Sequence, residues 1–260
     1  MRKNYHTHTH RCFHAQGADA DFAAAAKEQG FSVIGFSDHG PWPFKDYVSG
    51  MRMPAAALED YAESVFSLRA QYRGEMEILL GLESEYFPQY LPWLCAMAEK
   101  HGLDYLILGH HFSGNEPGGI YNGSLTHARD VVRYQKDVCA AMKTGLFSYV
   151  CHPDLFMRGY PVFDKTCEKA SRAIIETAME TNTPLEYNLL GLQHSLHDGK
   201  QGYPYPAFWQ LAAEYRATAI IGIDAHTPDA YRDTQTIAAA EQYLADLGIP
   251  VTDEIRLLHD

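Results

Sequence analysis

The chain contains few cysteines, and their spacing excludes two kinds of site. Its 260 residues include five cysteines, an odd number with no C-x-x-C pair. This argues against a disulfide framework and against a zinc site built from thiolates. We therefore expect reduced and mostly buried thiols. They are Cys12, Cys95, Cys139, Cys151 and Cys167.

Long apolar runs are also missing. No stretch approaches the length needed to span a membrane. Residues 1–4 lead into histidines and not into the apolar segment of a signal peptide. We expect a cytoplasmic protein with no membrane partner.

Basic residues are outnumbered by acidic ones. The chain has 21 Lys and Arg against 33 Asp and Glu, a formal net charge of -12. Nucleic acids and anionic membranes attract a basic surface, so this balance predicts no nucleic-acid partner. A small anionic substrate remains possible, because bound divalent cations would dominate the local field. No feature of the sequence indicates an oligomeric state.

Seven short apolar runs each lead into a residue able to bind metal or to form hydrogen bonds. The N-terminal segment is the first, and the others cover residues 32–37, 77–82, 104–109, 147–151, 184–187 and 218–223. Helical patterns separate them, at residues 19–30, 54–73, 88–102, 124–145, 164–181, 206–215 and 228–248. Alternating strands and helices predict a parallel sheet with both faces covered. We expect an α/β fold, a distorted (β/α)7 barrel forming a single domain over residues 1–260, with the polar strand ends at one mouth.

The N-terminal segment carries an H-x-H-x5-H pattern. On extended backbone alternate side chains share a face, so His6 and His8 can chelate one cation, and His14 can fold back over it. Imidazole suits Zn, Fe, Ni or Cu better than Mg or Ca. Taken alone, H-x-H is equally typical of surface histidines or of a tag remnant.

The ordered motifs together resemble the polymerase and histidinol phosphatase (PHP) superfamily. They are His6-x-His8, His14, Asp38-His39, Gly81-Leu82-Glu83, His111-Phe112, His152-Pro153-Asp154 and Asp224-Ala225-His226. Within it, the chain is similar to monofunctional PHP-type histidinol-phosphatases over residues 52–86 and 151–156. The resemblance implies a phosphoric monoester hydrolase of histidine biosynthesis that converts L-histidinol phosphate to L-histidinol and inorganic phosphate.

The resemblance also implies three divalent metal ions, Zn, Fe or Mn. By motif, the first ion would be held by His6, His8, Glu83 and Asp224; the second by Glu83, His111 and His152; and the third by His14, His39 and His226. A hydroxide bridging two cations would attack phosphorus in line, since metal binding lowers the pKa of water to about 7 in favourable sites. Asp224 or His226 would protonate the leaving alcohol.

Several residues keep two interpretations. Arg158 is placed to contact phosphate, or it is a solvated loop residue. His110 competes with His111 as ligand, and the position before Phe112 favours His111. Asp154 and Asn188 would either orient ligands or cap helices. Cys12 lies inside the histidine motif and is read mainly as a buried apolar residue, with metal contact as the lesser alternative.

Three connecting segments are interpreted as loops. Residues 191–202 read as a mobile polar loop, and residues 40–54 and 113–123 as long loops that resemble lids. Substrate choice would lie there. The alternatives to a histidinol-phosphatase are a PHP phosphoesterase for another small phosphorylated metabolite, a PHP-type nuclease, and a metal-binding protein that has lost turnover.

Overall fold

The computed structural model describes residues 2–259, apart from the side chain of Asp198, as two compact units. The first unit comprises the chain up to Ile107, residues Ile223–Thr234 and the segment from Arg256. The second unit comprises Leu108–Gly222 and Gln235–Ile255.

The first unit is built on a parallel sheet of predicted strands. Strands β1 (Arg2–Asn4), β2 (Phe31–Phe36) and β3 (Glu77–Ser84) pair in parallel, and β4 (Tyr105–Leu108) follows β3 in the sheet. β3 is buried along nearly its whole length, as expected when both faces of a sheet are covered. An isolated parallel bridge joins Thr7 to Ala225, so the segment after Ile223 lies against the N-terminal segment.

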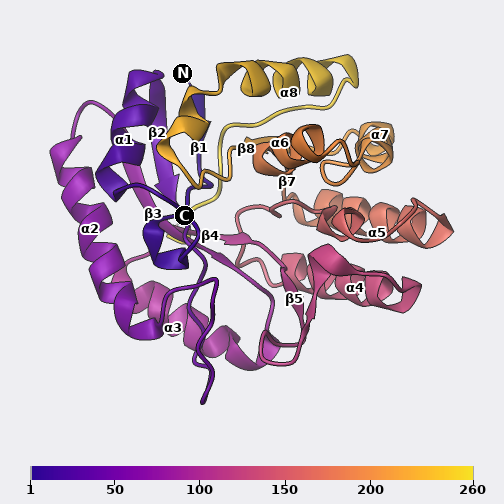
Figure 1. Cartoon of the computed structure of the whole chain (residues 1–260), viewed down its shortest axis with the longest axis horizontal. Coiled ribbons are helices and arrows are strands. Elements are labelled where there is room, and N and C mark those ends of the chain that lie inside the picture. Colours follow the sequence, from indigo (N-terminus) through magenta and orange to yellow (C-terminus); the bar gives the residue numbers. More distant parts are fainter. Residues whose placement is uncertain (1, 260) are drawn as a thin grey trace. The chain divides into compact units, whose positions relative to one another are not determined.

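Three helices cover the outer side of these strands, as Figure 1 shows: α1 (Asp19–Glu28), α2 (Leu58–Gln71) and α3 (Leu91–His101). The apolar positions that predicted α2, namely Leu58, Tyr61, Val65 and Leu68, are all buried. The 3-10 turns are η1 (His10–Cys12), η2 (Ala55–Ala57), η3 (Pro88–Tyr90) and η6 (Pro228–Arg232).

The second unit contains the parallel pair β7 (Leu185–Asn188) and β8 (Ala219–Gly222). Val150 forms single bridges to Leu108 and to Leu185. The run at residues 147–151 therefore takes the predicted place beside β7, but it is too irregular to count as a strand in the part of the chain described. The 113–123 segment is not a plain loop, because β5 (Phe112–Ser113) pairs with β6 (Ile120–Tyr121) in a short antiparallel hairpin.

The helices of this unit are α4 (Ala128–Lys143), α5 (Lys165–Thr181), α6 (Leu189–Asp198), α7 (Pro206–Tyr215) and α8 (Thr234–Asp246), with the turns η4 (Asn122–Ser124) and η5 (Leu155–Arg158). The expectation of a mobile loop at 191–202 was wrong over its first part. Asn188 caps α6 by accepting a hydrogen bond from the Gly191 N–H at 2.8 Å, which allows the helix to start before the glycine.

Among residues 2–259, no helix combines the length and the apolar character that a membrane crossing requires.

Candidate metal centre

The backbone around Thr7 places His6 and His8 on one face. The His8 N–H donates to the Ala225 carbonyl at 2.9 Å, and the Ala225 N–H donates to the His6 carbonyl at 3.1 Å. This extended pairing directs the Thr7 side chain the other way, where its Oγ1 lies 2.6 Å from the Tyr231 hydroxyl. The two imidazoles converge, with their Nε2 atoms 3.1 Å apart.

Two carboxylates complete this buried group. Asp224 Oδ1 lies 3.4 Å from His6 Nε2 and 3.1 Å from His8 Nε2. Glu83 lies 3.6 Å from His6 and 3.5 Å from His8, measured between a carboxylate oxygen and Nε2. Donors about 2.1 Å from one ion sit roughly 3.0–3.5 Å from each other in octahedral or tetrahedral geometry. Two nitrogens and two carboxylates at this spacing fit a divalent metal.

A second group of donors adjoins the first. His14, His39 and His226 offer nitrogen atoms that all lie within 4.8 Å of one another. The ring of His226 stacks between those of His8 and His14, with centroids 4.2 Å and 4.8 Å away. His39 Nδ1 lies 2.9 Å from Glu83 Oε2, so one carboxylate reaches both groups. These three histidines fit the set predicted for the third ion.

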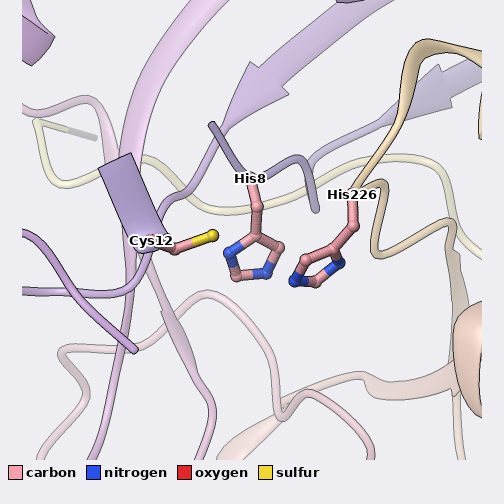
Figure 2. Close-up of side chains that lie close together, drawn as sticks. All are labelled: His8, Cys12 and His226. Atoms are coloured by element: carbon pink, nitrogen blue, oxygen red, sulfur yellow. The ribbon is translucent and has the colours of Figure 1, made fainter. Parts of the chain in front are cut away.

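Cys12 lies beside these rings. Figure 2 shows the ring of His8 between the Cys12 thiol and the ring of His226, and the three donor atoms lie within 4.8 Å of one another. The thiol is fully buried and accepts a hydrogen bond from the Ala15 N–H at 3.3 Å. Burial by itself would raise its pKa, but hydrogen bonds to His14 and His8 lower the pKa of Cys12 to about 7. The thiol packs as expected, and it could also bind a metal ion together with His8 and His226.

Charge is unevenly distributed among the rings. Burial disfavours a charged His8, yet hydrogen bonds to Asp224 and Asp38 raise its pKa well above the usual value. Burial, together with the neighbouring His8, lowers the pKa of His226 to about 4. The pKa of Asp224 lies well below its ordinary value, because the His6 and His8 rings outweigh its burial. A metal ion binding here would displace the proton from His8.

Asp38 orients the first group and was not predicted as a site residue. Its Oδ1 lies 3.4 Å from His8 Nδ1 and accepts from the His39 N–H at 2.8 Å, and its other oxygen accepts from the Thr9 hydroxyl. A carboxylate on the far nitrogen fixes the tautomer and orientation of a ligand histidine. The Asp38-His39 motif was the available signal, since the pair lies just beyond the end of β2.

The second unit holds the other two predicted ligand histidines. The rings of His111 and His152 lie 5.0 Å apart between centroids, and both residues are buried. His110 points elsewhere, with its Nε2 3.3 Å from Asp137 Oδ2 on α4. The geometry therefore favours His111 over His110 as the neighbour of His152, and the ligand role of His111 stays a prediction. The participation of Glu83 with this pair stays a prediction.

Arg158 is exposed and lines a cavity of about 120 Å³ in the second unit. His194, Lys200 and Tyr203 also line this cavity, and the Tyr203 ring packs edge-on against the His152 ring at 5.7 Å. The Arg158 guanidinium donates to the Tyr121 hydroxyl at 2.9 Å. A cavity lined by the side chains of Arg158, Lys200 and His194 suits an anion.

We expect Arg158→Ala to raise the KM for a phosphomonoester by roughly tenfold to a hundredfold, because a hydrogen bond to a charged group contributes about 1.5–3 kcal/mol. Steady-state kinetics with phosphate as competing product would measure the change. Arg172→Ala removes an arginine that pairs with Glu168 and Glu214 on the helices of the same unit, and it serves as the control. If both substitutions changed the KM equally, Arg158 would be a solvated loop residue that does not bind phosphate.

Asp154 and Asn188 have separate roles. Asn188 caps α6 and also donates from Nδ2 to Glu186 Oε2 at 2.8 Å. Asp154 does not cap the turn that it precedes, and its Oδ2 accepts from the Tyr205 N–H at 2.5 Å. Burial raises the pKa of Asp154 to about 7. Asn188 thus fixes the start of α6, and Asp154 fixes the backbone at Tyr205.

The 40–54 segment is anchored by a buried ion pair that sequence reasoning missed. Arg52 donates to both oxygens of Glu85, at 2.9 and 2.5 Å, and to the Gly40 carbonyl at 2.9 Å. The Trp42 indole N–H donates to Glu85 Oε2 at 2.8 Å. A cavity of about 150 Å³ remains between Phe13 and this segment. These contacts hold the two ends of the predicted lid, at Gly40 and Arg52, in place.

Known proteins resemble this chain in sequence and in fold. The chain is 28% identical to a probable histidinol-phosphatase of Deinococcus radiodurans over 230 residues, covering 86% of this chain and 85% of the relative. It is 24% identical to the histidinol-phosphatase of Bacillus subtilis, covering 87% and 94%. A crystal structure of histidinol phosphate phosphatase from Lactococcus lactis, complexed with Zn, L-histidinol and phosphate, matches with a TM-score of 0.72 at 17% identity, covering 98% of each chain.

The structural match confirms the predicted PHP-type α/β fold. The model of the PHP domain family matches residues 4–189, which carry most of the motifs quoted above. The chain belongs to the PHP domain family.

Proposed function

We propose that this protein is a metal-dependent phosphomonoesterase that hydrolyses L-histidinol phosphate to L-histidinol and phosphate. The observation that carries the proposal is the buried convergence of His6, His8, Glu83 and Asp224 at ligand spacing. Relatives named histidinol-phosphatase support the substrate, since they align along most of both chains. A cytoplasmic location accompanies this proposal.

We propose three divalent ions, Zn, Fe or Mn, held within one phosphoesterase domain. His6, His8, Glu83 and Asp224 would hold the first, and His14, His39 and His226 the third. His111 and His152 would serve the second, with Glu83 as their predicted companion. Such ions supply Lewis-acid charge for the phosphoryl oxygens and make water nucleophilic near neutral pH.

The side chains of the protein position these charges. Asp38 holds the far nitrogen of His8, which keeps its Nε2 directed at the donor group. Arg158 would bind the phosphoryl group, since its cavity collects basic side chains. Asp224 or His226 would protonate the departing alcohol, a role that remains a prediction. Phosphoryl transfer depends mainly on such positioning and electrostatic stabilisation.

Substrate preference tests the proposal. With Mn²⁺ or Zn²⁺ added, kcat/KM for L-histidinol phosphate should exceed that for para-nitrophenyl phosphate by at least about tenfold, which corresponds to about 1.4 kcal/mol. Chelation should abolish both activities, and readdition of metal should restore them. The measurement is release of phosphate over a panel of small phosphomonoesters. Equal turnover of both substrates would refute the substrate assignment and leave the phosphoesterase; retention of activity after chelation would refute both.

A further inference from the structure

Glu186 is a fully buried carboxylate on β7 that belongs to none of the predicted ligand sets. Its Oε2 accepts a hydrogen bond from the backbone N–H of His152 at 3.1 Å and another from Asn188 Nδ2 at 2.8 Å. A buried carboxylate requires such partners, because its desolvation is costly. Both donors lie in the second unit, as does Glu186.

The hydrogen-bond acceptors of the backbone change from main chain to side chain at His152. The Cys151 N–H donates to the Leu108 carbonyl, and the Val150 N–H donates to the Pro184 carbonyl. At His152 the chain leaves this pairing with φ 32°, in the left-handed region that residues other than glycine rarely adopt. The N–H of His152 donates to the side-chain carboxylate of Glu186, whereas the N–H groups of Val150 and Cys151 donate to backbone carbonyls.

The surroundings keep this carboxylate in place. A Cβ at Gly222 would lie 1.8 Å from Glu186 Oε1, so β8 accommodates the side chain only with glycine at this position. On the other side, Asn188 is held by its capping bond to Gly191 at the start of α6. The acceptor for His152 is thus fixed by a neighbouring strand and by a helix start.

We propose that Glu186 is a positioning residue: through the His152 backbone it sets the His152 ring beside the ring of His111 for metal binding. The inference rests on the proposed function, since it takes His152 as a ligand. Whereas Asp38 faces a ring nitrogen of His8, Glu186 accepts a hydrogen bond from the main chain of His152. Outer partners of metal ligands typically change metal affinity by roughly tenfold to a hundredfold.

The test compares two replacements of nearly equal volume. Glu186→Gln keeps an oxygen that accepts from the His152 N–H, whereas Glu186→Leu keeps none. His152→Ala provides the reference for loss of the ligand itself. Ile174→Ala, in the buried face of α5, provides a destabilised control in the same unit. Purified proteins are stripped, loaded with Zn²⁺ alone, and assayed for bound metal by mass spectrometry and for affinity by competition with a chelator.

His152→Ala identifies the Zn²⁺ ion that His152 binds. We expect Glu186→Leu to lower the affinity for this ion by roughly tenfold to a hundredfold, while the affinity of Glu186→Gln stays close to that of the unchanged protein. Gly222→Ala should reproduce the Leu result, because its methyl displaces the carboxylate. Undiminished Zn²⁺ affinity in Glu186→Leu, or equal losses in Glu186→Leu and Ile174→Ala, would overturn the inference while leaving the proposed function intact. Unchanged Zn²⁺ content in His152→Ala would instead contradict the ligand assignment in the proposed function.

Discussion

Replacing Glu83 by alanine is expected to lower kcat/KM for phosphomonoester hydrolysis by at least roughly a thousandfold, equivalent to about 4 kcal/mol of transition-state stabilisation. The carboxylate lies within 3.6 Å of His6 and His8 and 2.9 Å from His39, so its removal affects both donor groups of the first unit. We also expect fewer bound metal ions per chain.

Glu77→Ala is the matched control, because Glu77 lies on the same strand but is exposed at its opposite end. Its activity and metal content should remain within about twofold of the unchanged protein, as is usual for surface substitutions. Metal analysis and steady-state kinetics on both variants decide the point. Full phosphatase activity in Glu83→Ala would show that Glu83 does not take part in catalysis and would contradict the candidate site.

Arg52→Ala is expected to lower the free energy of unfolding by about 3–5 kcal/mol, because it leaves the Glu85 carboxylate buried without its cation. Arg52 is 2% exposed and Glu85 is 0% exposed, so water cannot replace the lost partner. The Gly40 carbonyl loses a donor as well. Urea unfolding followed by circular dichroism would measure the change.

The control is Arg73→Ala, at an exposed arginine beyond the end of α2, which should change stability by less than about 0.5 kcal/mol. A double variant, Arg52→Met with Glu85→Leu, should be less destabilised than the sum of the two single changes, because an apolar pair leaves no buried charge. Additive losses in the double variant would show that the pair is not coupled.

Local pattern was enough to predict most elements. The helical periodicity of residues 206–215 predicted α7 with both bounds correct. The alternation in H-x-H predicted the shared face of His6 and His8, since extended backbone has a period of two. The α6 segment was misread because its glycines and polar residues suggest a loop. Its start depends on the Asn188 cap, and Gly191 lies against the Tyr203 ring, where a Cβ would come within 2.3 Å.

Contacts between residues far apart in the chain could not be predicted from the local sequence pattern. Nothing near Glu186 in the sequence indicates that its carboxylate meets the His152 N–H, and nothing near Arg52 indicates Glu85. These contacts depend on strand register and on the course of a loop, which side-chain periodicity does not encode. Asp38 could have been predicted as a site residue, because its neighbour His39 was already a candidate.

The bridge between Thr7 and Ala225 has a consequence for biosynthesis. While the polypeptide grows on the ribosome, His6 and His8 emerge long before Asp224 and His226 have been translated. The first unit combines separate stretches of the chain, so His6 and His8 meet Asp224 only after the segment Ile223–Thr234 has been made and has packed beside them. The complete donor set at His6 and His8 therefore arises only after Asp224 has been translated, and tight metal binding there has to follow that step.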